Sequence, residues 1–344
     1  MGRRGWLLFG AMGLIWGIPY FLIRVAVRQL DPAVVVFGRA IIAAGVLTVL
    51  AHRTNALGVA LHRWRPVLAF AFVEMAVPWI LLTTAEQHLA SGLTALIIAS
   101  VPIVGAVTAF CLGDRLALRP VRVVGITIGL AGVAFLVERD LSSDSAPPWW
   151  SVVAVLVVVV CYATAPFIVQ RKLVDVPSFG VIALSLWVVA IIYAPIAAFS
   201  LPQHAPNFNA TLSVVGLGLV CTALAFVVFF RLIDEVGAAR GGLITFANPV
   251  VAVALGALFL DELVNLVTVT GSALVAIGCW LATRPNPILA TGSPLTLGGG
   301  KDERVARSRS SAAIEGEADG QDDTGRVRDR GKPGHRPGQR TRVG

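Results

Sequence analysis

Apolar stretches of about 20 residues recur along this chain, and they limit more than any other feature what it can fold into. A helix of roughly 20 predominantly apolar residues crosses the hydrocarbon core of a bilayer. Such stretches fall at residues 5–24, 33–51, 66–87, 91–112, 119–137, 149–170, 178–200, 211–231, 239–260 and 264–283. The sequence therefore predicts an all-α integral membrane protein with ten transmembrane helices.

The charge content agrees with this class. Only 14% of the residues are charged, against about 25% in soluble domains. The net charge of +8 is spread over the apolar body and the C-terminal end, and neither part forms the basic stripe that follows nucleic-acid phosphates. We therefore expect membrane lipid, and no nucleic acid, as a partner.

The first stretch follows a short basic start, as in a signal peptide. No small-residue cleavage site follows the segment MGRRGWLLFGAMGLIWG, and the apolar run continues past Phe21. We therefore interpret residues 5–24 as a retained membrane span.

Basic residues in the loops predict the orientation, because cytoplasmic loops are enriched in Lys and Arg. With the N-terminus inside, the outer segments hold Arg24, Arg28 and Arg139. The inner segments before the tail hold Arg3, Arg4, Arg53, Arg63, Arg65, Arg115, Arg119, Arg122, Arg171, Lys172, Arg231, Arg240 and Arg284. This asymmetry predicts a multi-pass protein of the inner or plasma membrane with both termini in the cytoplasm.

An internal repeat is visible when the sequence is shifted by 147 residues against itself. Pro19 then falls on Pro166, Arg24 on Arg171, Pro102 on Pro249, and Asp114 on Asp261. We expect two five-helix repeats, at 1–140 and 149–284, followed by a disordered cytoplasmic tail at 288–344. Because five is odd, the second repeat enters the membrane from the opposite side, as in many secondary transporters.

Several segments resemble those of a known family. They are IWGIPYF, DPAVVVFGRA and SVPIVGAVTAFCLGDRL in the first half, and GAARGGLITFANPVVAVALGALFLDEL and VTGSALVAIGCWLA in the second. Over roughly residues 5–284 the chain is similar to the EamA-type transporters of the drug/metabolite transporter superfamily. Where that family often has Gly-Glu, this chain has Gly113-Asp114 and Asp261-Glu262. The resemblance implies transport of small metabolites, with export favoured.

Glu74 is the most informative residue within the apolar runs. It lies about eight residues into its span, and Pro78 follows one helical turn later. A carboxylate at membrane depth costs roughly 2.5–3.5 kcal/mol and usually faces a cavity on a substrate or proton path. We expect Glu74 to bind a proton or a cationic solute; a structural hydrogen bond to a neighbouring helix is the alternative.

Arg39 is the second deep charge, about six residues into its span. A guanidinium stays protonated, so it needs an anion, backbone carbonyls or a route to the interface. Pairing with Glu74, binding of a substrate carboxylate, and extension to the membrane surface all stay open. Asn248 adds a polar group beside Pro249, for a substrate or for an interhelical hydrogen bond.

Deep aromatic and proline residues complete the candidate site. The aromatic side chains are predicted to line an amphipathic cavity with Glu74 or to pack between helices; they are Trp16, Tyr20, Trp79, Tyr162, Trp187 and Tyr193. Prolines remove helical hydrogen bonds and are predicted hinges; they are Pro19, Pro78, Pro102, Pro166, Pro195 and Pro249. The repeat relation of Pro102 and Pro249 favours a shared hinge.

Motifs of catalysis and of cofactor or metal binding are missing from the sequence. The five histidines all fall in predicted loops or the tail, and the four cysteines lie singly in apolar runs, where they are best explained as small buried hydrophobes. We therefore expect no enzyme, no cofactor and no metal. The GxxxG segments are explained by close helix packing and are compatible with a homodimer without supporting one.

The sequence thus predicts a secondary-active transporter of small, amino-acid-like or drug-like solutes. It would work by alternating access, as an exporter, with proton coupling through Glu74. A channel, or a membrane protein that handles lipid or a protein partner without solute flux, is the alternative. The substrate, the direction, the coupling ion and the oligomeric state are not encoded in any motif.

Overall fold

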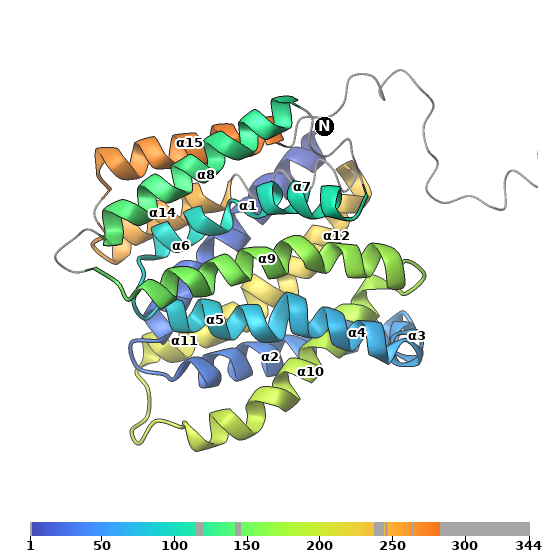
Figure 1. Cartoon of the computed structure of the whole chain (residues 1–344). Helices are drawn as coiled ribbons and strands as arrows, with labels where there is room; N and C mark the ends of the chain where they lie inside the picture. Colours follow the sequence, from blue (N-terminus) through green and yellow to red (C-terminus); the bar gives the residue numbers. More distant parts are fainter. Residues whose placement is uncertain are drawn as a thin grey trace, which may run out of the picture. The chain divides into compact units, whose positions relative to one another are not determined.

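The chain folds into helices throughout the part that the structure describes. The structure, a computed structural model, describes residues 2–113, 120–141, 146–236, 244, 247–262 and 264–282. The first half contains α1 (Arg3–Ala26), α2 (Pro32–Arg53), α3 (Ala56–His62), α4 (Trp64–Ala71), η1 (Phe72–Ala76), α5 (Val77–Ala85), α6 (Ser91–Ile98), α7 (Val101–Cys111) and α8 (Pro120–Leu141). The second half contains α9 (Trp149–Lys172), α10 (Ser178–Phe199), α11 (Phe208–Gly218), η3 (Leu219–Leu224), α12 (Ala225–Val236), α14 (Asn248–Phe259) and α15 (Leu266–Ala282). Figure 1 shows their arrangement.

Eight helices in the described residues are long and apolar enough to cross a membrane. They confirm the all-α, multi-pass architecture predicted from the sequence. The ninth and tenth predicted spans correspond to the shorter apolar helices α14, of 12 residues, and α15, of 17 residues. At 1.5 Å per residue α14 is about 18 Å long, short of the ~30 Å hydrocarbon core. The count of ten membrane helices therefore stays a prediction, and residues 239–243 and the tail at 288–344 lie outside the described residues.

Helix starts follow ordinary capping chemistry. The Asp31 side chain accepts a hydrogen bond from the Ala33 N–H at 2.9 Å, and Pro32 occupies the first turn of α2. Asn207 accepts from the Ala210 N–H at 2.8 Å at the start of α11. In both cases a short polar side chain satisfies an N–H group that has no partner inside the helix.

A π-helical turn interrupts the third long helix of each half. In the first half, η1 separates α4 from α5, and the Val77 N–H bonds the Phe72 carbonyl. Pro78 follows at once and offers no N–H to the carbonyl of Glu74. The Tyr193 hydroxyl donates to the Ala76 carbonyl at 2.9 Å and so supplies a donor from α10. The π turn is therefore stabilised by its own backbone hydrogen bond and by the Tyr193 side chain of α10.

The helix contacts pair elements that the 147-residue shift relates. Helix α2 packs against α10, and α8 packs against α15 (Figure 1). Helix α1 contacts α14 and α12, while α9, its counterpart under the shift, contacts their counterparts α7 and α5. Helices at corresponding positions in the two halves thus have corresponding neighbours.

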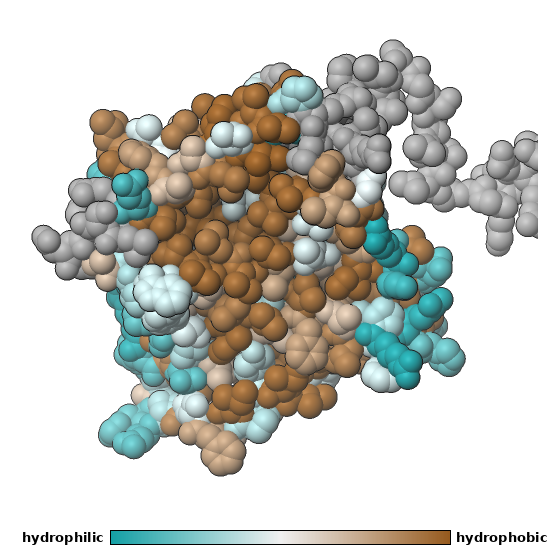
Figure 2. All heavy atoms as spheres, in the orientation of Figure 1, coloured by the Kyte–Doolittle hydropathy of each residue, from teal (hydrophilic) through white to brown (hydrophobic). Residues whose placement is uncertain are grey.

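The surface agrees with a membrane environment. Figure 2 shows hydrophobic residues over the middle of one face and hydrophilic residues gathered at its left and right ends. Many large hydrophobic side chains are exposed, among them Phe72, Leu156 and Ile191. A soluble protein rarely leaves such a continuous apolar surface uncovered.

Small residues bring α8 and α15 close together. A Cβ atom on Gly278 of α15 would lie 2.3 Å from the backbone nitrogen of Gly129 and 2.7 Å from the carbonyl oxygen of Gly125. The predicted GxxxG motif at Gly125 and Gly129 therefore serves a contact within the chain. The second motif, at Gly237 and Gly241, lies outside the described residues.

Candidate functional site

A cavity of about 210 Å³ lies between helices of the two halves and contains both deep charges. From the first half it is lined by Trp16, Pro19, Tyr20, Arg39, Glu74, Met75, Trp79, Leu82, Ile98 and Val101. From the second half it is lined by Tyr162, Cys221, Phe226 and Asn248. The structure thus brings together residues that are far apart in the sequence, including the predicted polar and aromatic site residues except Trp187 and Tyr193.

Glu74 reaches the cavity from the middle of η1. Its side chain is half-buried, while its neighbours Met75 and Ala76 are buried. Among the described residues it makes no ion pair, since the one ion pair there joins Arg4 to Glu235. Its carboxyl group is therefore free to bind a proton or a cationic group that enters the cavity.

Arg39 is held in the cavity wall by two contacts. Its Nε–H donates to the Thr222 hydroxyl at 2.8 Å, and its guanidinium carbon lies 3.8 Å from the centre of the Trp79 ring. The second contact has the geometry of a cation–π interaction. Arg39 therefore neither pairs with Glu74 nor extends toward the membrane surface, and its terminal N–H groups remain suited to an anion.

Thr222 was not identified as a site residue from the sequence. It lies in η3, where its hydroxyl donates to the Leu217 carbonyl at 2.8 Å and accepts from Arg39. A threonine within an apolar helix is usually explained by such a bond to its own backbone. The only signal that could have singled it out is its position one residue after Cys221, the repeat counterpart of Glu74.

Aromatic side chains form much of the remaining wall. The ring of Trp16 lies 4.8 Å from that of Phe229 and 6.5 Å from that of Phe226, measured between centroids. Tyr20 on α1 and Tyr162 on α9 bring two hydroxyl groups to the cavity. The arrangement combines apolar surface with a few polar groups, as small-molecule sites do.

Asn248 contributes a polar group without a partner. Its Oδ1 atom is buried and accepts no hydrogen bond in the described part of the chain. It lies at the first residue of α14, directly before Pro249. A buried acceptor without a donor is costly, so a ligand or water donor in the cavity would be favoured there.

Two of the deep aromatic residues lie elsewhere. Trp187 is 36% exposed and donates from Nε1 to the Thr48 hydroxyl at 2.9 Å, across the contact between α10 and α2. Tyr193 supports η1 through the Ala76 carbonyl. Both side chains join α10 to the first half and do not line the cavity.

The prolines fall at two kinds of place. Pro19, Pro166 and Pro195 lie inside α1, α9 and α10. Pro78, Pro102 and Pro249 lie in the first turn of α5, α7 and α14. Because α6 ends at Ile98 and α7 begins at Val101, the fourth apolar stretch is broken just before Pro102. Each proline of the repeat-related pair Pro102 and Pro249 therefore begins a helix.

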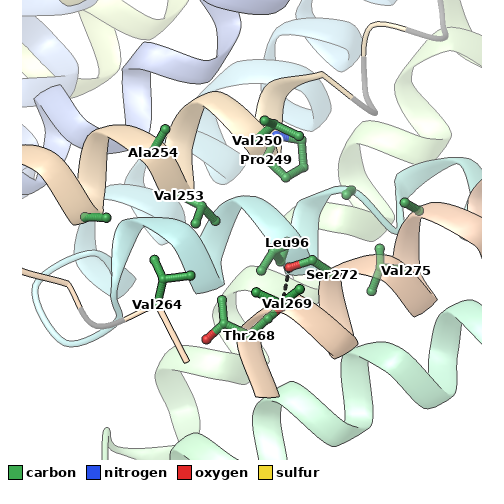
Figure 3. A pocket seen from close by; sticks show the side chains of 13 residues that line it. Leu96, Pro249, Val250, Val253, Ala254, Val264, Thr268, Val269, Ser272 and Val275 are labelled. Atoms are coloured by element: carbon green, nitrogen blue, oxygen red, sulfur yellow. Dashed lines mark hydrogen bonds between the residues drawn. The ribbon is translucent and has the colours of Figure 1, made fainter. Parts of the chain in front are cut away.

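A larger groove of about 480 Å³ lies between α6, α14 and α15 (Figure 3). Its walls are almost entirely aliphatic, and its Val250 is 70% exposed. Its two hydroxyl groups, on Thr268 and Ser272, bond Asn265 and the Thr268 carbonyl. The described residues that line this groove offer no charged group to select a solute, so we place the candidate site at the smaller, charged cavity.

Comparison with known proteins agrees with this architecture. The model of the EamA-like transporter family matches residues 3–138 and 149–284. The uncharacterized inner membrane transporter YedA of Escherichia coli is 31% identical over 257 residues, which cover 72% of this chain and 81% of YedA. An uncharacterized transporter of Archaeoglobus fulgidus is 24% identical over 287 residues, covering 81% of this chain and 98% of that protein.

Two further similarities bear on export and on the fold. A probable terminal-alkyne amino-acid exporter of Streptantibioticus cattleyicolor is 25% identical over 275 residues, which cover 78% of this chain and 90% of that protein. One crystal structure matches with a TM-score of 0.59 and 19% identity, over 82% of this chain and 97% of the other, and it supports the fold alone. Since the family model covers most of the chain in two matches, this multi-pass membrane protein belongs to the EamA-like transporter family and handles small-molecule solutes.

Proposed function

We propose that this protein is a secondary-active exporter of small amino-acid-like solutes, coupled to protons through Glu74. One observation carries the proposal: Glu74 and Arg39 line the same cavity without pairing with each other. A solute with an ammonium and a carboxylate group would satisfy both charges. The Streptantibioticus relative, named as a probable terminal-alkyne amino-acid exporter, favours the same class.

The size of the cavity favours a small solute. Sites for drug-sized ligands usually have volumes of about 300–1,000 Å³, whereas this one has about 210 Å³. The aromatic walls from Trp16 and Trp79 suit an apolar side chain beside the two charged groups. We therefore favour amino acids with apolar side chains over larger drug-like molecules.

Alternating access is supported by the paired contacts of the two halves. Helices related by the 147-residue shift have corresponding neighbours, as two inverted five-helix repeats require. The cavity lies where the halves meet, so rocking of one half against the other would expose it to each side in turn. We propose that the helix starts at Pro102 and Pro249 act as the hinges.

The orientation follows from the loop charges. We propose that both termini lie in the cytoplasm of the inner or plasma membrane, because the inner segments then hold most of the Arg and Lys residues. On this assignment the link between α5 and α6, at residues 86–90, faces the outside. A cysteine introduced at Ser143 in a cysteine-free background should react with an impermeant thiol reagent in intact cells; labelling only after lysis would reverse the assignment.

Flux measurements with the purified protein test the function. The protein is reconstituted in liposomes and given a panel of radiolabelled apolar amino acids, with and without an imposed pH gradient. We expect saturable transport that the gradient accelerates, with protons moving against the solute. Flux that does not saturate and ignores the gradient would indicate a channel, and no flux with any solute of a wider metabolite panel would contradict the transport proposal.

A further inference from the structure

A second buried carboxyl group lies away from the cavity. Glu86 directly follows α5, one residue beyond the apolar span 64–85. Its side chain is 0% exposed, and neither Oε1 nor Oε2 has a hydrogen-bond partner among the described residues. An ionised carboxylate in such a place would lose its hydration without compensation.

Glu262, the acid that acts electrostatically on Glu86, has hydrogen-bond partners of its own. Glu262, in the link between α14 and α15, accepts hydrogen bonds from the Ser91 N–H at 2.7 Å, the Ser91 hydroxyl at 2.8 Å and the Gly92 N–H at 3.1 Å. It fits there because Gly256 has no side chain, since a Cβ would lie 2.3 Å from Glu262 Oε2. These donors at the start of α6 hold the Glu262 carboxyl group in place. The carboxyl group that acts electrostatically on Glu86 is thus supplied by the second half.

Arg24 does not neutralise the Glu86 carboxyl group. Its guanidinium donates to the backbone carbonyl of Glu86, and no ion pair joins the two side chains in the described part of the chain. Tyr20, one turn earlier on α1, also lies within electrostatic reach. The adjoining end of α9 presents Trp150, which packs on the exposed His88, and no charged residue. Among the described residues, the groups with an electrostatic effect between them and Glu86 are thus Arg24, Tyr20 and Glu262.

These surroundings favour the protonated form. Burial, and then the negative charge of Glu262, raise the pKa of the Glu86 carboxyl well above its usual range, while Arg24 acts in the opposite direction. Under the 147-residue shift Glu86 corresponds to Ile233. The acid is therefore present in one half only and is not required by the repeated architecture.

We propose that Glu86 is a second proton-binding site, which holds a proton in this conformation and releases it to water when the end of the bundle between α5 and α6 opens. Opening would separate Glu86 from Glu262 and let Arg24 turn to the carboxylate that remains. Tyr20 lines the central cavity and lies on α1 one turn before Arg24. The proposal concerns proton binding and does not depend on the role of Glu74.

The pH dependence of stability tests the proposal. Because the pKa of Glu86 is raised in the folded state, its contribution is fully present below the ordinary glutamate pKa of about 4.3 and is lost as the pH rises toward the folded value. Glu86→Gln imitates the protonated form at every pH. The Tm of the purified variant should match that of the wild type near pH 4–5 and exceed it by a further 2–4 °C or so for each pH unit above.

Glu138→Gln is the matched control, because Glu138 is an exposed glutamate of α8. Its Tm difference from the wild type should stay flat with pH. A flat difference for Glu86→Gln as well would overturn the proposal, because the pKa of Glu86 would then be the same in the folded and unfolded states.

Infrared spectroscopy gives a second reading that tolerates failure of the Gln variant to fold. A protonated-carboxyl band should persist at neutral pH in the wild type and in Glu74→Gln, where Glu74 cannot contribute to it. In Arg24→Gln, which removes the nearby positive charge, the same band should persist to higher pH. No band in the Glu74→Gln protein, or a titration unchanged by Arg24→Gln, would each overturn the proposal, whatever the outcome of the transport assays.

Discussion

The third long helix of each half has the same backbone irregularity and a different chemistry. The 147-residue shift places η1, residues 72–76, on residues 219–223 of η3. Glu74 then corresponds to Cys221, and both line the cavity. Trp79 corresponds to Phe226 and Val101 to Asn248, and all four line it too. The backbone geometry is therefore repeated, while each polar group of these pairs is present in one half only.

The two π turns also have different local causes. Pro78 follows η1, whereas the corresponding position after η3 is Ala225. In η3 the Thr222 hydroxyl bonds the Leu217 carbonyl five residues earlier, and that bond also positions the acceptor for Arg39. Two different sequences thus reach one backbone form, which indicates that this form matters to the cavity wall, as π turns often do at functional sites.

The largest difference between the halves is expected at Glu74 and its counterpart Cys221. Glu74→Gln keeps the side-chain shape and removes the titration, so gradient-driven transport in proteoliposomes should fall to background, roughly 100-fold or more. Glu74→Asp should keep partial activity with an altered pH profile. Cys221→Ser, at the corresponding position, should stay within about twofold of the wild type, since an exchange of sulfur for oxygen leaves no ionised group at neutral pH.

Full gradient-driven transport by Glu74→Gln would remove Glu74 as the coupling group. Detergent-extracted protein should be compared first by size-exclusion chromatography, so that loss of folded protein is not mistaken for loss of coupling. Retained substrate binding without gradient response is the result that separates coupling from recognition.

Close helix packing gives the next contrast. Gly278 is buried against Gly129, while its counterpart under the shift, Ala131, is exposed on α8. Gly278→Leu has no room for its side chain and should destabilise the fold by about 1–3 kcal/mol or more through overpacking. Ala131→Leu should change stability by less than about 0.5 kcal/mol. Thermal unfolding of the two purified variants checks the difference, and equal Tm values would contradict the α8–α15 contact.

Much of the architecture could be predicted because apolar length and internal similarity are written along the chain. The depth of Glu74 and Arg39 in their spans was enough to identify them as candidates, and the structure brings both to one cavity. The sequence could not place Trp187, because an aromatic residue in an apolar helix has the same pattern whether it faces a cavity or a neighbouring helix. It also did not predict the π turns, nor the bond from Arg39 to Thr222, since both depend on contacts between residues distant in sequence.

Recognition of a carboxylate should depend on the form of the cation at position 39. Arg39→Lys keeps the charge and loses both the Nε–H bond to Thr222 and the stacking on Trp79. These contacts together contribute about 1.4 kcal/mol or more, so the apparent affinity for an amino acid should fall about tenfold. A decarboxylated amine of the same side chain should be affected much less. An equal loss for both solutes would show that Arg39 serves the fold of the cavity.

Trp79→Phe tests the same wall of the cavity. It gives the first half the phenylalanine that the second half has at the corresponding position, Phe226. A phenyl ring is a weaker cation–π partner than an indole, so affinity should fall by roughly two- to threefold, less than in Arg39→Lys. Competition binding with the amino acid and its amine checks the order of the two effects. A larger loss in Trp79→Phe would make apolar packing, and not the held guanidinium, the main contribution of this wall.

The smallest effect is expected at the prolines, where the halves are alike. Pro102 and Pro249 each begin a helix at corresponding positions. Alanine restores the missing N–H and lets the preceding turn continue the helix, which should stiffen a hinge. Each single variant should therefore slow turnover by about two- to fivefold and leave the affinity for the solute nearly unchanged. Because a rocking motion uses both hinges, the two variants should resemble each other, unlike Glu74→Gln and Cys221→Ser. Exchange rates and binding constants measured on the same preparations decide the matter: weaker binding with normal turnover would make the prolines part of the solute site, and a large effect at one proline alone would mean that the halves do not move as equivalent units.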